Sequence, residues 1–118
     1  MTQKILFADD EENTLKALAR YMTVANVDTE YFTSATEALD YLGQQQIDIV
    51  VSDLKMSEMD GIAFLKEVQK SYPGIDRVLL SSFGSENMEI KQALQDRTIE
   101  QCFSKPWELL AYLRRIER

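Results

Sequence analysis

Five short apolar segments alternate with five stretches that carry apolar residues at helical spacing, and this alternation restricts the fold more than any other feature of the chain. The strands are expected at residues 4–8, 29–33, 47–52, 76–80 and 99–104, and the helices at 11–25, 34–43, 62–72, 86–96 and 107–118. A capping box at Ser34–Glu37 indicates the start of the second helix, and Asp60-Gly61 is expected to form a turn before the third. The fourth helix is expected to turn an irregular apolar stripe inward, formed by Met88, Ile90, Ala93 and Leu94. Strands that alternate with helices form a parallel sheet with helices on both faces and right-handed crossovers. We therefore predict one doubly wound α/β domain that spans residues 1–118.

Composition excludes several classes of function. The formal net charge is −7, with 20 acidic and 13 basic residues, so we expect no nucleic-acid binding by this domain, because neutralisation of phosphates supplies most of that affinity. No apolar run approaches the roughly 20 residues of a membrane span. The single cysteine, Cys102, fits a reducing compartment, so we expect a cytoplasmic protein that binds no membrane. Histidine is absent, which leaves carboxylates, hydroxyls, lysines and one thiol for any chemistry.

Polar side chains follow four of the five expected strands. They are Asp9 and Asp10 after the first strand, Asp53 after the third, Ser81 after the fourth and Lys105 after the fifth. In a parallel sheet the carboxyl ends of the strands meet at one edge, which is where such folds bind ligands. Each residue alone has a structural explanation: Asp10 could cap the following helix, Ser81 could start a turn, and Lys105 could be a solvated charge. Their joint occurrence at four strand ends favours a shared site.

The residue types in this set point to phosphoryl chemistry. Two carboxylates about 4 Å apart repel each other by about 4 kcal/mol at an effective dielectric constant of about 20. A hard divalent cation relieves that repulsion, and Mg²⁺ suits oxygen ligands better than zinc does, so we predict that Asp9, Asp10 and Asp53 bind Mg²⁺. Asp53 is the candidate nucleophile, because carboxylates can form acyl phosphates. Lys105 would neutralise the transferred group, and Ser81 would donate a hydrogen bond to it.

These motifs resemble those of the CheY-like receiver domains of two-component response regulators. The matching motifs are Asp9-Asp10, Asp53-Leu54-Lys55-Met56, Met59-Asp60-Gly61, Ser81 and Lys105-Pro106. The resemblance implies the flavodoxin-like strand order 2-1-3-4-5, for which CheY is itself a standard example. It implies that Asp53 is the phosphoacceptor in a phosphorelay and receives its phosphoryl group from a sensor histidine kinase or a phosphotransfer protein.

The resemblance has further implications. The backbone carbonyl of Lys55 would bind Mg²⁺ together with Asp53 and with Asp9 or Asp10. The Lys105–Pro106 peptide bond would be cis. The domain would not be an enzyme for external substrates, because it would catalyse only its own phosphorylation and dephosphorylation. Its phosphorylation would change the surface formed by residues 86–118, and its output would come from a C-terminal domain of a longer protein or from a separate target protein.

Several positions depart from the family pattern. Ser57 stands where the family often has proline, which is expected to loosen its loop, and Ser82 stands where a smaller residue is common. Cys102 replaces a tyrosine or phenylalanine that swings inward on activation, so that movement is expected to be reduced or to pass to Phe103. The resemblance also places Lys55 and Phe83 beside the path of a hydrolytic water. Neither side chain accepts a hydrogen bond, so we expect slow self-dephosphorylation.

Two alternatives remain open from the sequence. The first is a pseudo-receiver that docks partners without phosphoryl transfer. The second is a phosphatase of the aspartyl-phosphate type, which is disfavoured because such enzymes use an acid-x-acid motif, whereas Lys55 follows two residues after Asp53. The acidic cluster, Ser81 and Lys105 favour the phosphoacceptor, since a docking module has no need of them.

Overall fold

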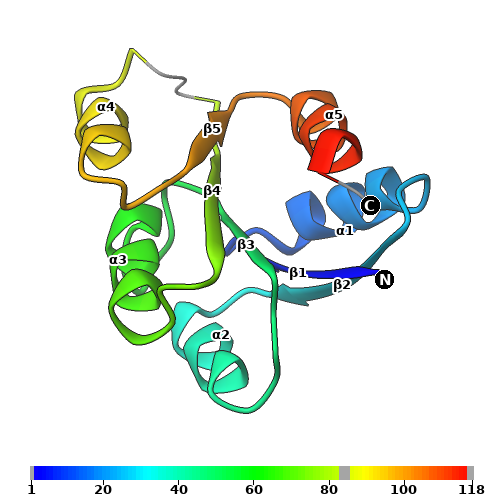
Figure 1. Cartoon of the computed structure of the whole chain (residues 1–118), viewed down its shortest axis with the longest axis horizontal. Coiled ribbons are helices and arrows are strands. Elements are labelled where there is room, and N and C mark those ends of the chain that lie inside the picture. Colours follow the sequence, from blue (N-terminus) through cyan, green and yellow to red (C-terminus); the bar gives the residue numbers. More distant parts are fainter. Residues whose placement is uncertain (1, 83–85, 117–118) are drawn as a thin grey trace.

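The computed structural model describes residues 2–82 and 86–116, which form a central parallel sheet covered by helices on both faces (Figure 1). The strands are β1 (Gln3–Ala8), β2 (Val27–Phe32), β3 (Ile49–Ser52), β4 (Asp76–Leu80) and β5 (Gln101–Phe103). The helices are α1 (Glu12–Met22), α2 (Ala35–Leu42), α3 (Gly61–Ser71), α4 (Met88–Gln95) and α5 (Pro106–Ile116). The five strands lie in the order β2-β1-β3-β4-β5 and every neighbouring pair is parallel. The predicted fold class and strand order are confirmed.

The sheet separates two hydrophobic cores. Successive side chains of a strand point to opposite faces, so in β1 Leu6 packs on one side while Ile5 and Phe7 pack on the other. One core lies beneath α2, α3 and α4, and the other lies beneath α1 and α5, in the layers that Figure 1 shows. Because both faces are covered, the central residues of β1, β3 and β4 are apolar on both sides, which is why they appeared as short continuous runs in the sequence.

The register of the strands brings their carboxyl ends to one edge of the sheet. Ala8 pairs with Ser52, and Ser52 pairs with Leu79. Hydrogen bonds continue this alignment one residue further. The Asp9 backbone N–H donates to Phe32 O at 3.1 Å, Asp53 N–H donates to Ala8 O at 3.0 Å, and Ser81 N–H donates to Phe103 O at 2.9 Å. Asp9, Asp53 and Ser81 therefore begin at the same edge, as the sequence predicted.

Helix starts follow the capping chemistry of the sequence. The Ser34 hydroxyl accepts a hydrogen bond from the Glu37 backbone N–H at 3.2 Å, which confirms the predicted start of α2. Asp60 accepts from the Ala63 N–H at 2.7 Å at the start of α3. Among the described residues, no helix combines the length and the apolar character that crossing a membrane requires.

Two expectations were wrong. Met88 was expected to face inward with Ile90, but its side chain is 77% exposed, because residues two apart in a helix do not share a face. The described residues contain no cis peptide bond, so Lys105–Pro106 is trans. Pro106 is the first residue of α5, where the ring suits the backbone and the missing N–H breaks no helical hydrogen bond.

A buried arginine lies near the end of the sheet that is opposite the carboxyl ends of the strands. Arg77 on β4 is only 5% exposed, and its guanidinium donates to Ile75 O at 2.8 Å, Arg97 O at 3.0 Å and Thr98 O at 2.7 Å. It also pairs with Glu100 at 2.9 Å. These bonds hold the turn between α4 and β5 against β4. Within this turn Arg97 adopts a left-handed backbone conformation with φ of 60°.

Candidate functional site

Two aspartates at the carboxyl edge of the sheet differ from the third in burial. Asp9 is 7% exposed and Asp53 is half-buried, whereas Asp10 is exposed. Asp9 accepts a hydrogen bond from the Glu11 backbone N–H at 2.9 Å, which fixes its carboxylate at the turn into α1. Glu11, the residue before α1, has no side-chain cap bond. The sequence left open that Asp10 caps this helix; instead Asp9 makes the local bond.

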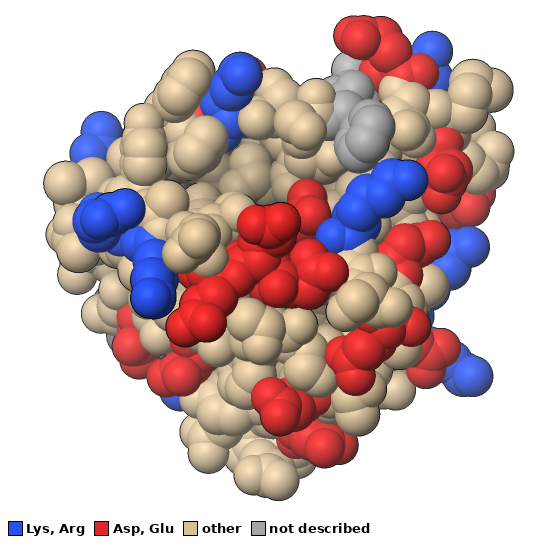
Figure 2. All heavy atoms as spheres, turned by 180° about the vertical axis from the view of Figure 1, so that it is seen from behind, with Lys and Arg blue, Asp and Glu red and all other residues tan. Residues whose placement is uncertain are grey.

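Burial and crowding both act on these carboxylates. Burial, followed by the charges of Asp53, Asp10 and Glu11, raises the pKa of Asp9 to about 6, against the opposing effect of its hydrogen bond from Glu11. Burial raises the pKa of Asp53 as well, while hydrogen bonds from the backbone N–H groups of Leu54 and Lys55 lower it. Figure 2 shows acidic side chains gathered near the middle of one face of the molecule. Ionisation of Asp9 and Asp53 in the folded protein therefore costs free energy.

The donor atoms suit a hydrated magnesium ion. In residues 2–82 and 86–116, no three aspartate, glutamate, histidine or cysteine side chains form a ready-made metal cage. Mg²⁺ does not require one, because it keeps several waters and commonly uses one or two carboxylates together with phosphate oxygens. Asp9 and Asp53 provide hard oxygen ligands whose repulsion a cation would relieve. The residues present fit Mg²⁺, and its ligand set stays a prediction.

A groove of about 520 Å³ opens beside these carboxylates. Of the predicted site residues, all of which the structure describes, Asp9, Asp53 and Ser81 line it. Ser81 is 3% exposed. Lys105 is exposed and lies between Ser104 and Pro106, both of which line the groove. Lys55 is also exposed, in the loop that follows Asp53.

The loop after β3 is closed tightly beneath Asp53. The Gly61 backbone N–H donates to Leu54 O at 2.7 Å, and the Ser52 hydroxyl donates to Asp53 O at 2.8 Å. A Cβ atom at Gly61 would lie 1.8 Å from the Asp53 carbonyl oxygen. The sequence predicted a turn at Asp60-Gly61, but it did not reveal that Gly61 lies against the backbone of the candidate nucleophile.

Residues 5–117 match the sequence model of the response regulator receiver domain. The chain belongs to this family. The prediction of a receiver domain of two-component response regulators is confirmed, and the fold described above is that of a receiver domain.

Individual relatives agree with this family. The receiver domain is 36% identical over 81 residues to the transcriptional regulatory protein GlrR of Escherichia coli K12, covering 69% of this chain and 18% of GlrR. It is 33% identical over 92 residues to the C4-dicarboxylate transport transcriptional regulatory protein DctD of Rhizobium meliloti, covering 78% of this chain and 20% of DctD. The chain thus spans about a fifth of the length of these curated relatives.

A solved structure supports the same fold. The signal receiver domain of an HD domain-containing protein from Pseudomonas fluorescens Pf-5 has a TM-score of 0.85 and 26% sequence identity to this chain. The match covers 98% of this receiver domain and 94% of the other chain.

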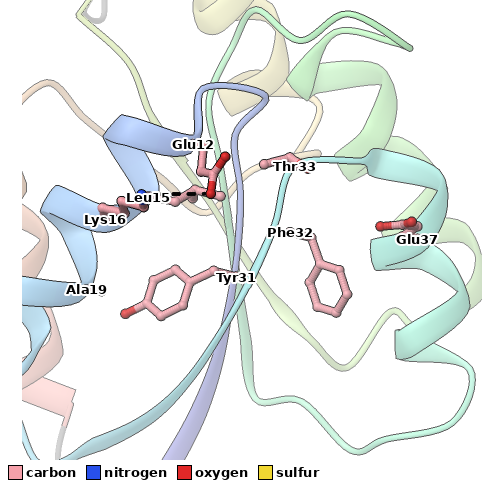
Figure 3. A pocket seen from close by; sticks show the side chains of 8 residues that line it. All are labelled: Glu12, Leu15, Lys16, Ala19, Tyr31, Phe32, Thr33 and Glu37. Atoms are coloured by element: carbon pink, nitrogen blue, oxygen red, sulfur yellow. Dashed lines mark ion pairs between the residues drawn. The ribbon is translucent and has the colours of Figure 1, made fainter.

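A second hollow, of about 540 Å³, lies on another part of the receiver domain, between α1, β2 and α2 (Figure 3). Tyr31 and Phe32 project from β2 to opposite sides there, and Glu12 pairs with Lys16 at 3.9 Å. It contains none of the predicted site residues. Its size is similar to that of the groove, so the chemistry of the lining, and not the volume, places the candidate site beside Asp53.

Three predicted positions remain to be placed. Phe83 lies outside the described residues, so slow self-dephosphorylation stays a prediction. Cys102 is half-buried on the core beneath α2, α3 and α4. Phe103 faces the other core, where its ring lies 5.4 Å from that of Tyr112. These two candidates for an activation movement therefore point to opposite layers.

Substituting Asp9 with asparagine is expected to raise the free energy of unfolding at pH 8 by about 2 kcal/mol without metal. The pKa of Asp9 is raised on folding, so the folded state favours its protonated form. This contribution is fully present below about pH 4 and is lost as the pH rises through about 6. Asparagine keeps the acceptor for Glu11 but carries no charge. Urea unfolding at pH 4 to 8 measures the effect, with the exposed Asp40→Asn as control. A variant no more stable than wild type at pH 8 would contradict the assigned cost of burying the Asp9 charge beside its acidic neighbours.

Proposed function

We propose that this receiver domain is a phosphorylation switch in which Asp53 accepts a phosphoryl group from a sensor histidine kinase or a phosphotransfer protein. The observation that carries the proposal is that Asp53 lies at the end of β3 in one groove with Asp9 and Ser81. The donor imidazole must lie outside these 118 residues, because they contain no histidine. A pure docking module has no need for buried carboxylates whose charges repel one another.

The reaction is a transfer of one phosphoryl group. A carboxylate oxygen of Asp53 attacks phosphorus, an O–P bond forms, and the P–N bond to the donor imidazole breaks with its electron pair going to the ring nitrogen. The backbone N–H groups of Leu54 and Lys55 hold the Asp53 carboxylate in place. Ser81 would donate its hydroxyl hydrogen to a phosphoryl oxygen. The long side chain of Lys105 would bring its ammonium into the groove from the rim and neutralise the incoming charge.

Mg²⁺ supplies charge neutralisation when it is bound. Asp9, Asp53, Asp10 and the carbonyl of Lys55 would hold it. The domain acts only on itself in this scheme, so it catalyses its own phosphorylation and dephosphorylation. We place it in the cytoplasm. We propose that its output lies in a further domain of a longer protein or in a separate target, since GlrR and DctD are transcriptional regulatory proteins of which it covers about a fifth.

Incubation with acetyl phosphate and Mg²⁺ is expected to add one phosphoryl group, which mass spectrometry detects as a single mass increment. Asp53→Asn should lose this increment entirely, because an amide is not a nucleophile for phosphorus. Asp40→Asn, which changes an exposed carboxylate on α2, should keep it. An increment that persists in Asp53→Asn would move the site elsewhere, and no increment in wild type would favour the docking module.

The phosphoryl group is proposed to act on the surface of α4, β5 and α5 through Ser81. The Ser81 backbone N–H donates to Phe103 O at 2.9 Å, so a shift of Ser81 toward the phosphoryl oxygens would pull on β5. Addition of beryllofluoride with Mg²⁺ is expected to change amide exchange in residues 88–112. Asp53→Asn is the control, since it should not bind the mimic. Unchanged exchange across this segment in wild type would leave no switch on that surface.

A further inference from the structure

Glu58 joins the middle of the loop between β3 and α3 to the start of α2. Its Oε1 accepts from the Ser34 hydroxyl at 2.8 Å and from the Thr36 backbone N–H at 3.4 Å. Its Oε2 accepts from the Thr36 hydroxyl at 3.2 Å. The hydrogen bond from Ser34, with those from Thr36, lowers the pKa of Glu58. The charged carboxylate therefore binds the first turn of a helix, where a negative charge is favourable.

The α2 end of this contact is fixed in the core. Ala35, Ala38 and Leu42 of α2 are buried beneath the sheet. The Ser34 hydroxyl that donates to Glu58 also accepts from the Glu37 N–H at 3.2 Å, so its position is set by the helix cap. A side chain that binds Ser34 and Thr36 thus binds a rigid element and not another mobile loop.

The other end of the Glu58 contact is the loop between β3 and α3, whose first residues bond to the Asp53 carboxylate. The backbone N–H groups of Leu54 and Lys55 bond to the Asp53 carboxylate. The loop is closed behind them by the bond from Gly61 N–H to Leu54 O at 2.7 Å. Between these points Ser57 has none of the backbone restraint that a proline imposes. Glu58, the next residue, supplies a restraint through its side chain.

We infer that Glu58 is a positioning residue for the phosphorylation site: by binding Ser34 and Thr36 it holds the loop that carries the Leu54 and Lys55 amides and the Lys55 carbonyl. The inference rests on the proposed function of Asp53 and adds to it a role for α2. Loss of the contact would let residues 55–59 move, and would thereby disorder the Lys55 carbonyl relative to Asp53. Both metal affinity and the rate of phosphorylation should then fall together.

The test compares Glu58→Ala with Glu58→Gln. Alanine removes all three bonds, whereas glutamine keeps an acceptor for Ser34 and a donor for the Thr36 hydroxyl. In Glu58→Ala, without metal or phosphoryl donor, amide exchange of residues 55–59 should become about tenfold faster. Mg²⁺ affinity, titrated by calorimetry, and the rate of phosphorylation by acetyl phosphate should each fall by about tenfold. Glu58→Gln should retain most of each value, and Glu67→Ala, an exposed change on α3, should match wild type.

The outcomes separate the inference from the proposed function. Failure of wild type to become phosphorylated at Asp53 would defeat the proposed function, and the positioning role with it. Normal phosphorylation of wild type together with unchanged loop exchange in Glu58→Ala would overturn the inference alone. Faster exchange with unchanged Mg²⁺ affinity and phosphorylation rate would also overturn it, because the contact would then be merely structural. Equal losses in Glu58→Ala and Glu58→Gln would overturn it as well, because charge, and not the hydrogen-bonded contact, would then be responsible.

Discussion

Gly61→Ala is expected to lower the free energy of unfolding by about 3 kcal/mol or more and to impair phosphorylation of whatever protein remains folded. The new methyl carbon would lie 1.8 Å from the Asp53 carbonyl oxygen, 2.8 Å from its carbonyl carbon and 2.9 Å from the Ser52 hydroxyl. Two of these atoms belong to the backbone, so no side-chain rotation relieves the clash. The strand end that carries the candidate nucleophile must shift instead.

Urea unfolding and the acetyl phosphate reaction measure the two effects of Gly61→Ala separately. Gly74→Ala is the matched control, because a Cβ atom at Gly74 would meet no atom within 4 Å. It should change the free energy of unfolding by no more than about 0.5 kcal/mol. If the two alanine variants proved equally stable, the close approach of Gly61 to Asp53 would be incorrect.

Arg77→Met is expected to lower the free energy of unfolding by about 3 kcal/mol. Methionine fills much of the volume, but it leaves the carbonyls of Ile75, Arg97 and Thr98 without the donors that now lie 2.7 to 3.0 Å away. It also removes the partner of Glu100. The loss should concentrate in the turn between α4 and β5, because Arg77 fastens that turn to the sheet.

Two companion variants sharpen the Arg77 experiment. Glu100→Gln should have a smaller effect, because the Glu100 side chain is 37% exposed and Arg77 would retain all of its carbonyl acceptors. Arg114→Met, on the exposed side of α5, should leave stability nearly unchanged. Amide exchange of residues 96–101 reports where the structure opens. A loss no greater in Arg77→Met than in Arg114→Met would refute a stabilising role of the buried guanidinium.

The features that the sequence predicted well are those set by local patterns. Apolar runs indicated the strands because both faces of the sheet are covered, and the Ser34 capping box indicated the start of α2 because it needs only neighbouring residues. The strand order did not follow from the pattern, since alternation alone allows several arrangements; it came from the family resemblance. The acidic residues at strand ends were recognisable because a parallel sheet brings those ends together.

The features that the sequence missed depend on contacts between distant segments. Glu58 reaches Ser34 across 24 positions, and Arg77 binds the Arg97 carbonyl across 20. Neither residue belongs to a motif. Gly61 had a turn signal, but only the folded chain shows that the Asp53 backbone occupies the space of its missing side chain. Met88 was misplaced for a local reason: it lies two positions before Ile90 at the start of α4, and residues at that spacing point to different sides of a helix.

The separation of the interior into two cores has a consequence for how such a domain can diverge. Side chains beneath α1 and α5 do not share partners with those beneath α2, α3 and α4, because the sheet lies between them. Substitutions in independent neighbourhoods combine additively, whereas those within one neighbourhood depend on each other. Mutations that reshape the surface of α1 and α5 for a new partner can therefore accumulate one at a time, without compensating changes under the opposite helices.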